Sequence, residues 1–163
     1  MRTLGILFLS LTPFLFALDY KANLKNQSDF ILCFKEFIVF TKEQIRFSLR
    51  EVNEIFALAY QNPEFKRYIF KNGKISFDNT ENIAKSIENA NDIRLKPIIR
   101  THINTFFKGL GTTDTEGQIN HCNYYISAFT IFGKKAQEDA SQKGRLALAL
   151  SLSLSLAMFI IMI

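Results

Sequence analysis

The sequence predicts an all-α protein, an antiparallel helical bundle flanked by membrane helices at its N and C termini. Three observations support this. Apolar residues in the middle of the chain recur at helical spacing, without a strong pair of strands. Residues 3–18 and 146–163 carry no charge. Of the 20 basic and 15 acidic residues, only Arg2 lies outside residues 19–145. This distribution excludes a simple soluble globule and a disordered chain, and two cysteines are too few for a disulfide scaffold.

The chain therefore divides into three predicted parts. Residues 1–18 form an N-terminal membrane anchor or signal-like helix, residues 19–145 a helical-bundle domain, and residues 146–163 a C-terminal transmembrane helix. The last segment spans roughly 27 Å as a helix, close to the ~30 Å hydrocarbon core of a bilayer. Its Leu/Ser alternation also suits a strand, but a lone strand cannot satisfy its backbone in lipid. A buried core helix is the alternative, and it would need a larger protein around it.

The N-terminal segment leaves two alternatives open. Its sixteen apolar residues span only ~24 Å as a helix, and Pro13 is expected to kink it. A cleaved signal peptide would end after Ala17, but Leu15 then occupies a position that favours a small residue. The sequence favours a retained anchor over a cleaved signal.

The first soluble helices are predicted from residue 29 onward. Between residues 29 and 60 one face is apolar, and Ser28 or Asp29 is a plausible N-cap. That face comprises Phe30, Phe34, Phe37, Ile38, Ile45, Leu49, Val52 and Phe56. Asn62-Pro63-Glu64 then ends one helix and starts a short one over 63–71, which Asn72-Gly73 stops. The helical spacing of Phe34, Phe37, Phe40 and Phe47 spreads around more than one side. Most of these rings are expected to be core, and the pattern does not tell core from partner surface.

Three further elements follow. Residues 74–77 are an extended link, and residues 80–90 form a helix. A helix opened by Pro97 has Ile99, Ile103, Phe106 and Phe107 on one face and ends at Gly109-Leu110-Gly111. The last helix starts with a Thr113/Glu116 capping box or with Asp114 as its cap. Because no strong breaker follows before Gly144, this helix is expected to run directly into the membrane segment.

The sequence offers no chemistry of its own. His102 and His121 lack metal-type or catalytic spacing, and Gly109-Leu110-Gly111 lacks the Lys-Ser/Thr of a phosphate loop. We expect no enzyme activity, no cofactor and no metal. The charges of the middle alternate in sign, which argues against nucleic acid as a partner. Cys33 and Cys122 are expected to be reduced, packed thiols in a cytoplasmic domain, or one long-range disulfide if the domain is exported.

The stretch Leu110-Gly111-x-x-Asp114-x-x-x-Gln118, with an apolar start, a long amphipathic helix and an apolar tail, resembles the stage III sporulation protein AB family of endospore-forming bacteria. The segment around Glu43, Ile45, Ser48 and Leu49 is similar to a second family stretch, although Arg50-Glu51 replaces its Pro-Leu. Lys143-Gly144-Arg145 likewise departs from the family's entry into the tail. The resemblance covers essentially the whole chain.

This resemblance implies a fold similar to the inner-membrane platform protein of type II secretion. It also implies a non-enzymatic assembly subunit of the channel between mother cell and forespore. Its expected partners are other stage III group A proteins, including a secretion-type ATPase, and membrane lipid; the oligomeric state stays open. The expected location is the mother-cell side, in the outer forespore membrane, with the domain in the cytoplasm. Basic residues beside both apolar ends favour that sidedness.

Two interpretations remain for the residues Leu110, Gly111, Asp114 and Gln118. In the first, they form a structural turn in which Gly111 bends the chain and Asp114 caps the next helix. In the second, the same turn is an exposed contact for the ATPase or a ring subunit. Two further functions compete with the platform. One is an exported, tail-anchored binding module, and the other is a membrane enzyme whose site is scattered through the sequence.

Overall fold

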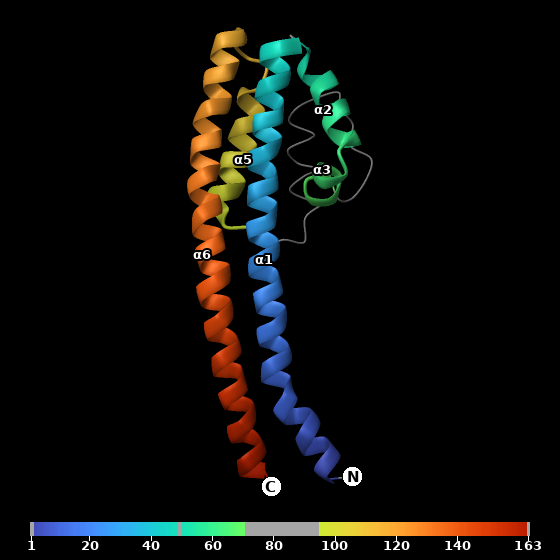
Figure 1. Ribbon diagram of the computed structural model, residues 1–163, viewed down its shortest axis with the longest axis vertical. Coiled ribbons are helices and arrows are strands. Elements are labelled where there is room, and N and C mark those ends of the chain that lie inside the picture. The colour runs from blue at the N-terminus through green and yellow to red at the C-terminus, as the bar shows by residue number, and fades with distance from the viewer. Residues whose placement is uncertain (1, 49, 71–94, 163) are drawn as a thin grey trace. The chain divides into compact units, whose positions relative to one another are not determined.

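The computed structural model describes residues 2–48, 50–70 and 95–162, and side chains over 10–48, 50–70 and 95–161. Five helices cover these ranges and no strand occurs in them, which confirms the all-α prediction (Figure 1). They are α1 (Arg2–Ser48), α2 (Val52–Gln61), α3 (Pro63–Tyr68), α5 (Pro97–Gly109) and α6 (Thr115–Met162). The predicted extended link over 74–77 and helix over 80–90 lie outside the described residues.

The chain forms two compact units, and both long helices contribute to each. One unit comprises residues 1–28 and 135–163, and the other comprises residues 29–134. The second contains α2, α3 and α5 together with the adjoining parts of α1 and α6. It carries most of the buried side chains and the candidate site.

An aromatic cluster forms the core of the 29–134 unit. Phe34 lies at its centre, with its ring centroid 4.7 Å from that of Phe129 and 5.9 Å from those of Phe106 and Phe107. Every helix of the unit supplies a buried ring or aliphatic chain, because each presents one apolar face at helical spacing. The fully buried phenylalanines are Phe30, Phe34, Phe37, Phe56, Phe70, Phe106, Phe107 and Phe129.

In this unit α1 and α6 run in opposite directions. Leu32 lies beside Gly133, where a Cβ would come within 2.9 Å of its Cδ2. Further along, Phe34 meets Phe129, and Ile45 lines the same cavity as Gln118. Residue numbers therefore rise along α1 as they fall along α6. An antiparallel order for the complete bundle stays a prediction, since it includes residues 80–90.

Two predicted boundaries along the first half of the chain are wrong. Ser28 caps no helix, because α1 passes through it and buries it to 4% exposure. Residues 19–28 contain no Gly or Pro, so their polarity alone does not stop a helix. The predicted continuous helix over 29–60 instead breaks between Ser48 and Val52, where Glu51 is extended. The break turns Ile55, Phe56 and Ala59 into the core.

Other helix starts and ends follow their predicted chemistry. The Asn62 side chain accepts a hydrogen bond from the Glu64 N–H, and Pro63 opens α3, as predicted. Pro97 opens α5, whose buried residues are the predicted Ile99, Ile103, Phe106 and Phe107. The short helix predicted over 63–71 ends at Tyr68.

α6 runs without interruption through Gly144, which confirms the predicted continuous helix. Among the described residues, this is the one helix long and apolar enough to cross a membrane. α1 also continues through Pro13. The N-terminal membrane helix stays a prediction, since the side chains of residues 2–9 lie outside the description.

Candidate functional site: the turn before α6

A tight turn connects α5 to α6. Leu110, extended after the last residue of α5, is 4% exposed and anchors the turn to the core. Gly111 has a φ of 81°, a left-handed conformation that costs other residues roughly 1–2 kcal/mol. At Gly109 a Cβ would collide with the ring of His121. Gly111 therefore permits the sharp turn, and Gly109 permits the close contact with His121 of α6.

Gln118 holds the turn in place from the first part of α6. Its Oε1 accepts a hydrogen bond from the Gly111 N–H at 2.9 Å. Its Nε2 donates to the Thr113 Oγ1 at 3.1 Å and lies 3.4 Å from the Thr113 carbonyl oxygen. The side chain is 5% exposed, so these contacts replace hydrogen bonds to water.

We expect Gln118→Ala to lower the free energy of unfolding by about 1–3 kcal/mol, because it leaves the Gly111 N–H and the Thr113 hydroxyl without this partner. Chemical denaturation of the full chain in detergent, followed by near-UV circular dichroism, measures the change. Asn120→Ala is the matched control, since Asn120 is an exposed amide two residues away on the same helix. Equal stabilities of the two variants would contradict the role given to Gln118.

Asp114 is the N-cap of α6. Its Oδ1 accepts a hydrogen bond from the Gly117 N–H at 3.0 Å, and its carbonyl oxygen accepts from the Gln118 N–H at 2.9 Å. The predicted Thr113/Glu116 capping box is therefore replaced by the alternative cap, Asp114. Thr113 is displaced from that role because its hydroxyl bonds to Gln118. Asp114 itself is exposed on the turn.

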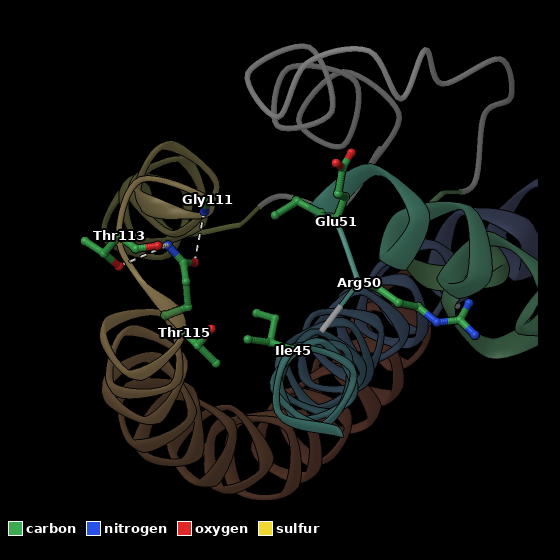
Figure 2. A pocket seen from close by; sticks show the side chains of 8 residues that line it. Ile45, Arg50, Glu51, Gly111, Thr113 and Thr115 are labelled. Carbon is green, nitrogen blue, oxygen red and sulfur yellow. Dashed lines mark hydrogen bonds between the residues drawn. The ribbon is translucent and has the colours of Figure 1, made fainter. Parts of the chain in front are cut away.

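The turn forms one wall of a cavity of about 370 Å³ (Figure 2). Ile45 reaches toward Thr115 from the opposite wall, whereas the Arg50 guanidinium points away from the turn. The opposite wall comes from the break between α1 and α2. The cavity is lined by Ile45, Arg50, Glu51, Val52, Gly111, Thr113, Thr115 and Gln118.

Charged side chains lie on and near the two segments that form the cavity walls. Arg50 and Glu51 are exposed beside the cavity, and Asp114 and Glu116 are exposed at the start of α6. Among the lining residues, charged Arg50 and Glu51 stand next to apolar Ile45 and Val52. The lining holds no nucleophile paired with a base, as covalent catalysis would need. Sequence reasoning missed Arg50 and Glu51 as members of this site.

The two histidines bind backbone carbonyls away from the cavity. His102 Nδ1 lies 2.8 Å from the Ile98 carbonyl oxygen, and His121 Nε2 lies 3.0 Å from that of Phe106. Because a carbonyl oxygen only accepts, the ring nitrogen donates in both contacts. Both rings also contact Tyr125. Within the described ranges no group of three or more His, Cys, Asp or Glu residues could hold a metal ion.

Both cysteines are free and packed. Burial, with Glu64 and Glu36 nearby, raises the pKa of Cys33 from 9.0 to about 12. Burial raises the pKa of Cys122 to about 11, although Lys42 opposes the shift. Cys33 follows Leu32, which faces Gly133, whereas Cys122 lies near Lys42. The thiols are thus separated by roughly 15 Å along the helices, too far for a disulfide.

We expect neither thiol of the folded chain to react with a maleimide at pH 8, because only the thiolate is nucleophilic. Unfolding should release both thiols for labelling. An unfolded chain would lose these protons near pH 9 and the folded chain only near pH 11–12, so the free energy of unfolding should fall as the pH rises above 9. Rapid labelling of either cysteine in the folded protein, measured by mass spectrometry, would contradict the raised values.

A family model for stage III sporulation protein AB matches residues 2–163. The chain belongs to the stage III sporulation protein AB family. Searches among curated proteins and among solved structures gave no significant match.

The cavity is lined by residues from both of the stretches that resemble the family's. Ile45 belongs to the earlier stretch, and Gly111 and Gln118 belong to the later one. These stretches are more than sixty residues apart in the sequence of this stage III sporulation protein AB family member. Arg50 and Glu51, at the place where the resemblance led us to expect Pro-Leu, also line the cavity, so this chain has charged side chains there.

Proposed function

We propose that this stage III sporulation protein AB family member is a non-enzymatic membrane platform subunit. It docks a secretion-type ATPase and ring proteins of the channel between mother cell and forespore. The observation that carries the proposal is the continuity of α6. The helix begins at the capped turn beside the cavity and ends in the apolar segment that can cross a membrane. One element thus holds both the docking surface and the membrane anchor.

The N-terminal segment is retained as a second membrane helix in this proposal. In the unit formed by residues 1–28 and 135–163, the apolar segments bury the small residues Ser10, Ala17 and Ser151, and the small residue Gly144 is buried just before the second segment. Large apolar side chains such as Leu15, Phe16 and Leu154 are exposed instead. Small residues between helices and large ones outside are typical of helix packing in lipid, and Figure 1 shows α1 and α6 side by side in this unit.

The soluble unit then lies in the mother-cell cytoplasm. Lys21, Lys143 and Arg145 follow or precede the apolar segments, and basic residues at membrane exits favour the cytoplasmic side. Free, separated cysteines suit a reducing compartment. A motor in the cytoplasm can reach the cavity only from that side.

Cysteine labelling tests this sidedness. Glu54 is exposed on α2, and Glu54→Cys in a Cys33→Ser/Cys122→Ser background offers one reactive thiol. We expect a membrane-impermeant maleimide to label it only after permeabilisation of the cells. Lys108→Cys, exposed near the end of α5, is a second site that should give the same result. Labelling of both sites in intact cells would overturn the proposal and favour the exported, tail-anchored module.

A further inference from the structure

Three cations gather where both long helices become apolar. A Cβ on Gly144 would lie 3.0 Å from the Lys21 Cγ, so the aliphatic stem of Lys21 crosses α6 at this glycine. Lys143 and Arg145 flank Gly144 in the sequence, and successive residues on a helix are turned ~100° apart, so they lie on either side of Lys21. All belong to the unit of residues 1–28 and 135–163. We call Lys21, Lys143 and Arg145 the cationic collar.

The collar lies where the apolar segments of both helices end. The apolar part of α1 ends at Leu18 and that of α6 begins at Leu146. The contact between Lys21 and Gly144 therefore places the ends of the two apolar segments side by side. Tyr20, close to Lys143, is 46% exposed. Tyrosine at such a position is typical of the membrane–water interface.

Acidic groups compensate only part of this charge. Asp139 Oδ1 lies 2.8 Å from the Lys143 Nζ, and this hydrogen bond raises the pKa of Lys143, which keeps it protonated. Asp19 accepts hydrogen bonds from the neutral Asn23 amide. Lys21 and Arg145 are exposed and have no acidic partner among the described contacts. They are therefore available to an anion at the membrane surface.

We propose that the cationic collar binds the phosphate of an anionic phospholipid headgroup, with Lys21 and Arg145 as its main contacts. This rests on the proposed function in one respect, the insertion of both helices in the membrane. A lipid is the occupant because the cations border exposed leucines on the same helices, such as Leu146 and Leu150, which suit acyl chains. A soluble phosphate would use the charge but none of this apolar surface.

Native mass spectrometry of the full chain in an uncharged detergent tests the proposal. Phosphatidylglycerol, phosphatidylcholine with the same acyl chains, and inorganic phosphate are the three probes. Each basic residue near an anionic lipid surface contributes a roughly fivefold gain in binding. Lys21→Gln/Arg145→Gln should therefore weaken phosphatidylglycerol binding about 30-fold and leave phosphatidylcholine binding unchanged.

Two matched variants sharpen the result. Lys66→Gln/Lys108→Gln removes two exposed cations from the other unit and should leave lipid binding unchanged. Asp19→Asn keeps an oxygen for the Asn23 amide but removes a negative charge two residues before Lys21 in the sequence, so it should strengthen phosphatidylglycerol binding up to about fivefold.

Three outcomes would overturn the proposed lipid binding by the collar. They are equal binding of the two lipids, full phosphatidylglycerol binding by Lys21→Gln/Arg145→Gln, and displacement of the lipid by millimolar inorganic phosphate. This assay in detergent does not depend on which side of the membrane holds the soluble unit. A domain found outside the cytoplasm with intact phosphatidylglycerol binding would overturn the proposed function alone.

Discussion

Replacing Phe34 with alanine is expected to lower the free energy of unfolding by about 3–5 kcal/mol. Phe34 is fully buried, and its ring contacts five others, those of Phe30, Phe37, Phe106, Phe107 and Phe129. These rings come from α1, α5 and α6, so the cavity left by alanine lies where three helices meet. No single neighbour can close it without losing its own contacts.

Phe47→Ala is the matched control, because Phe47 lies on the same helix but is 72% exposed. Its removal should change the free energy of unfolding by no more than about 0.5 kcal/mol. Near-UV circular dichroism of the full chain in detergent follows the unfolding, since the buried Tyr125 contacts Phe106 in the same core. Similar losses in the two variants would show that the ring cluster does not hold the unit together.

Asp114→Asn is expected to keep the fold and yet sharply reduce the number of heat-resistant spores. Asparagine is as good an N-cap as aspartate, so its amide oxygen can accept from the Gly117 N–H and stability should stay within about 0.5 kcal/mol. The substitution removes the charge of an exposed carboxylate on the turn that forms one wall of the cavity. Under the proposed function that charge contacts the ATPase or a ring protein.

Asp114→Ala separates the two roles of this residue. It removes both the cap and the charge, and should lower the free energy of unfolding by about 1 kcal/mol. Spore counts and denaturation curves of both variants are compared with those of the unchanged chain. Normal sporulation of Asp114→Asn, with a defect only in Asp114→Ala, would show that the residue acts through capping.

Part of the candidate site was predictable because its chemistry is local. A glycine in the left-handed region and an aspartate that caps the next helix act on residues only a few positions away. Their spacing therefore predicted the turn, and it predicted Asp114 as one of two alternative caps for α6. The role of Gln118 was missed. Its contacts with Gly111 and Thr113 depend on how the turn folds back on α6, which no periodic pattern encodes.

The break at Ser48–Val52 illustrates the opposite case. Residues 29–60 carry one unbroken apolar stripe, without a glycine or proline to interrupt it. The chain nevertheless turns there, and Phe56 packs against Phe37 and Phe107. Burying these rings against one another outweighs the local preference for a continuous helix, as tertiary packing often does.

The sequence by itself determined the helical class, the apolar C-terminal segment, the unbroken path of α6 and the helix starts at Pro63 and Pro97. Each follows from composition, periodicity or capping within one segment. Only the tertiary structure decided which of Phe34, Phe37, Phe40 and Phe47 are core, with Phe34 and Phe37 fully buried and Phe47 exposed. The tertiary structure also decided that residues of the α1–α2 break and of the turn before α6 line one cavity, and that Lys21 lies against Gly144. Those outcomes depend on contacts between residues far apart in the chain, which packing selects and local preference does not.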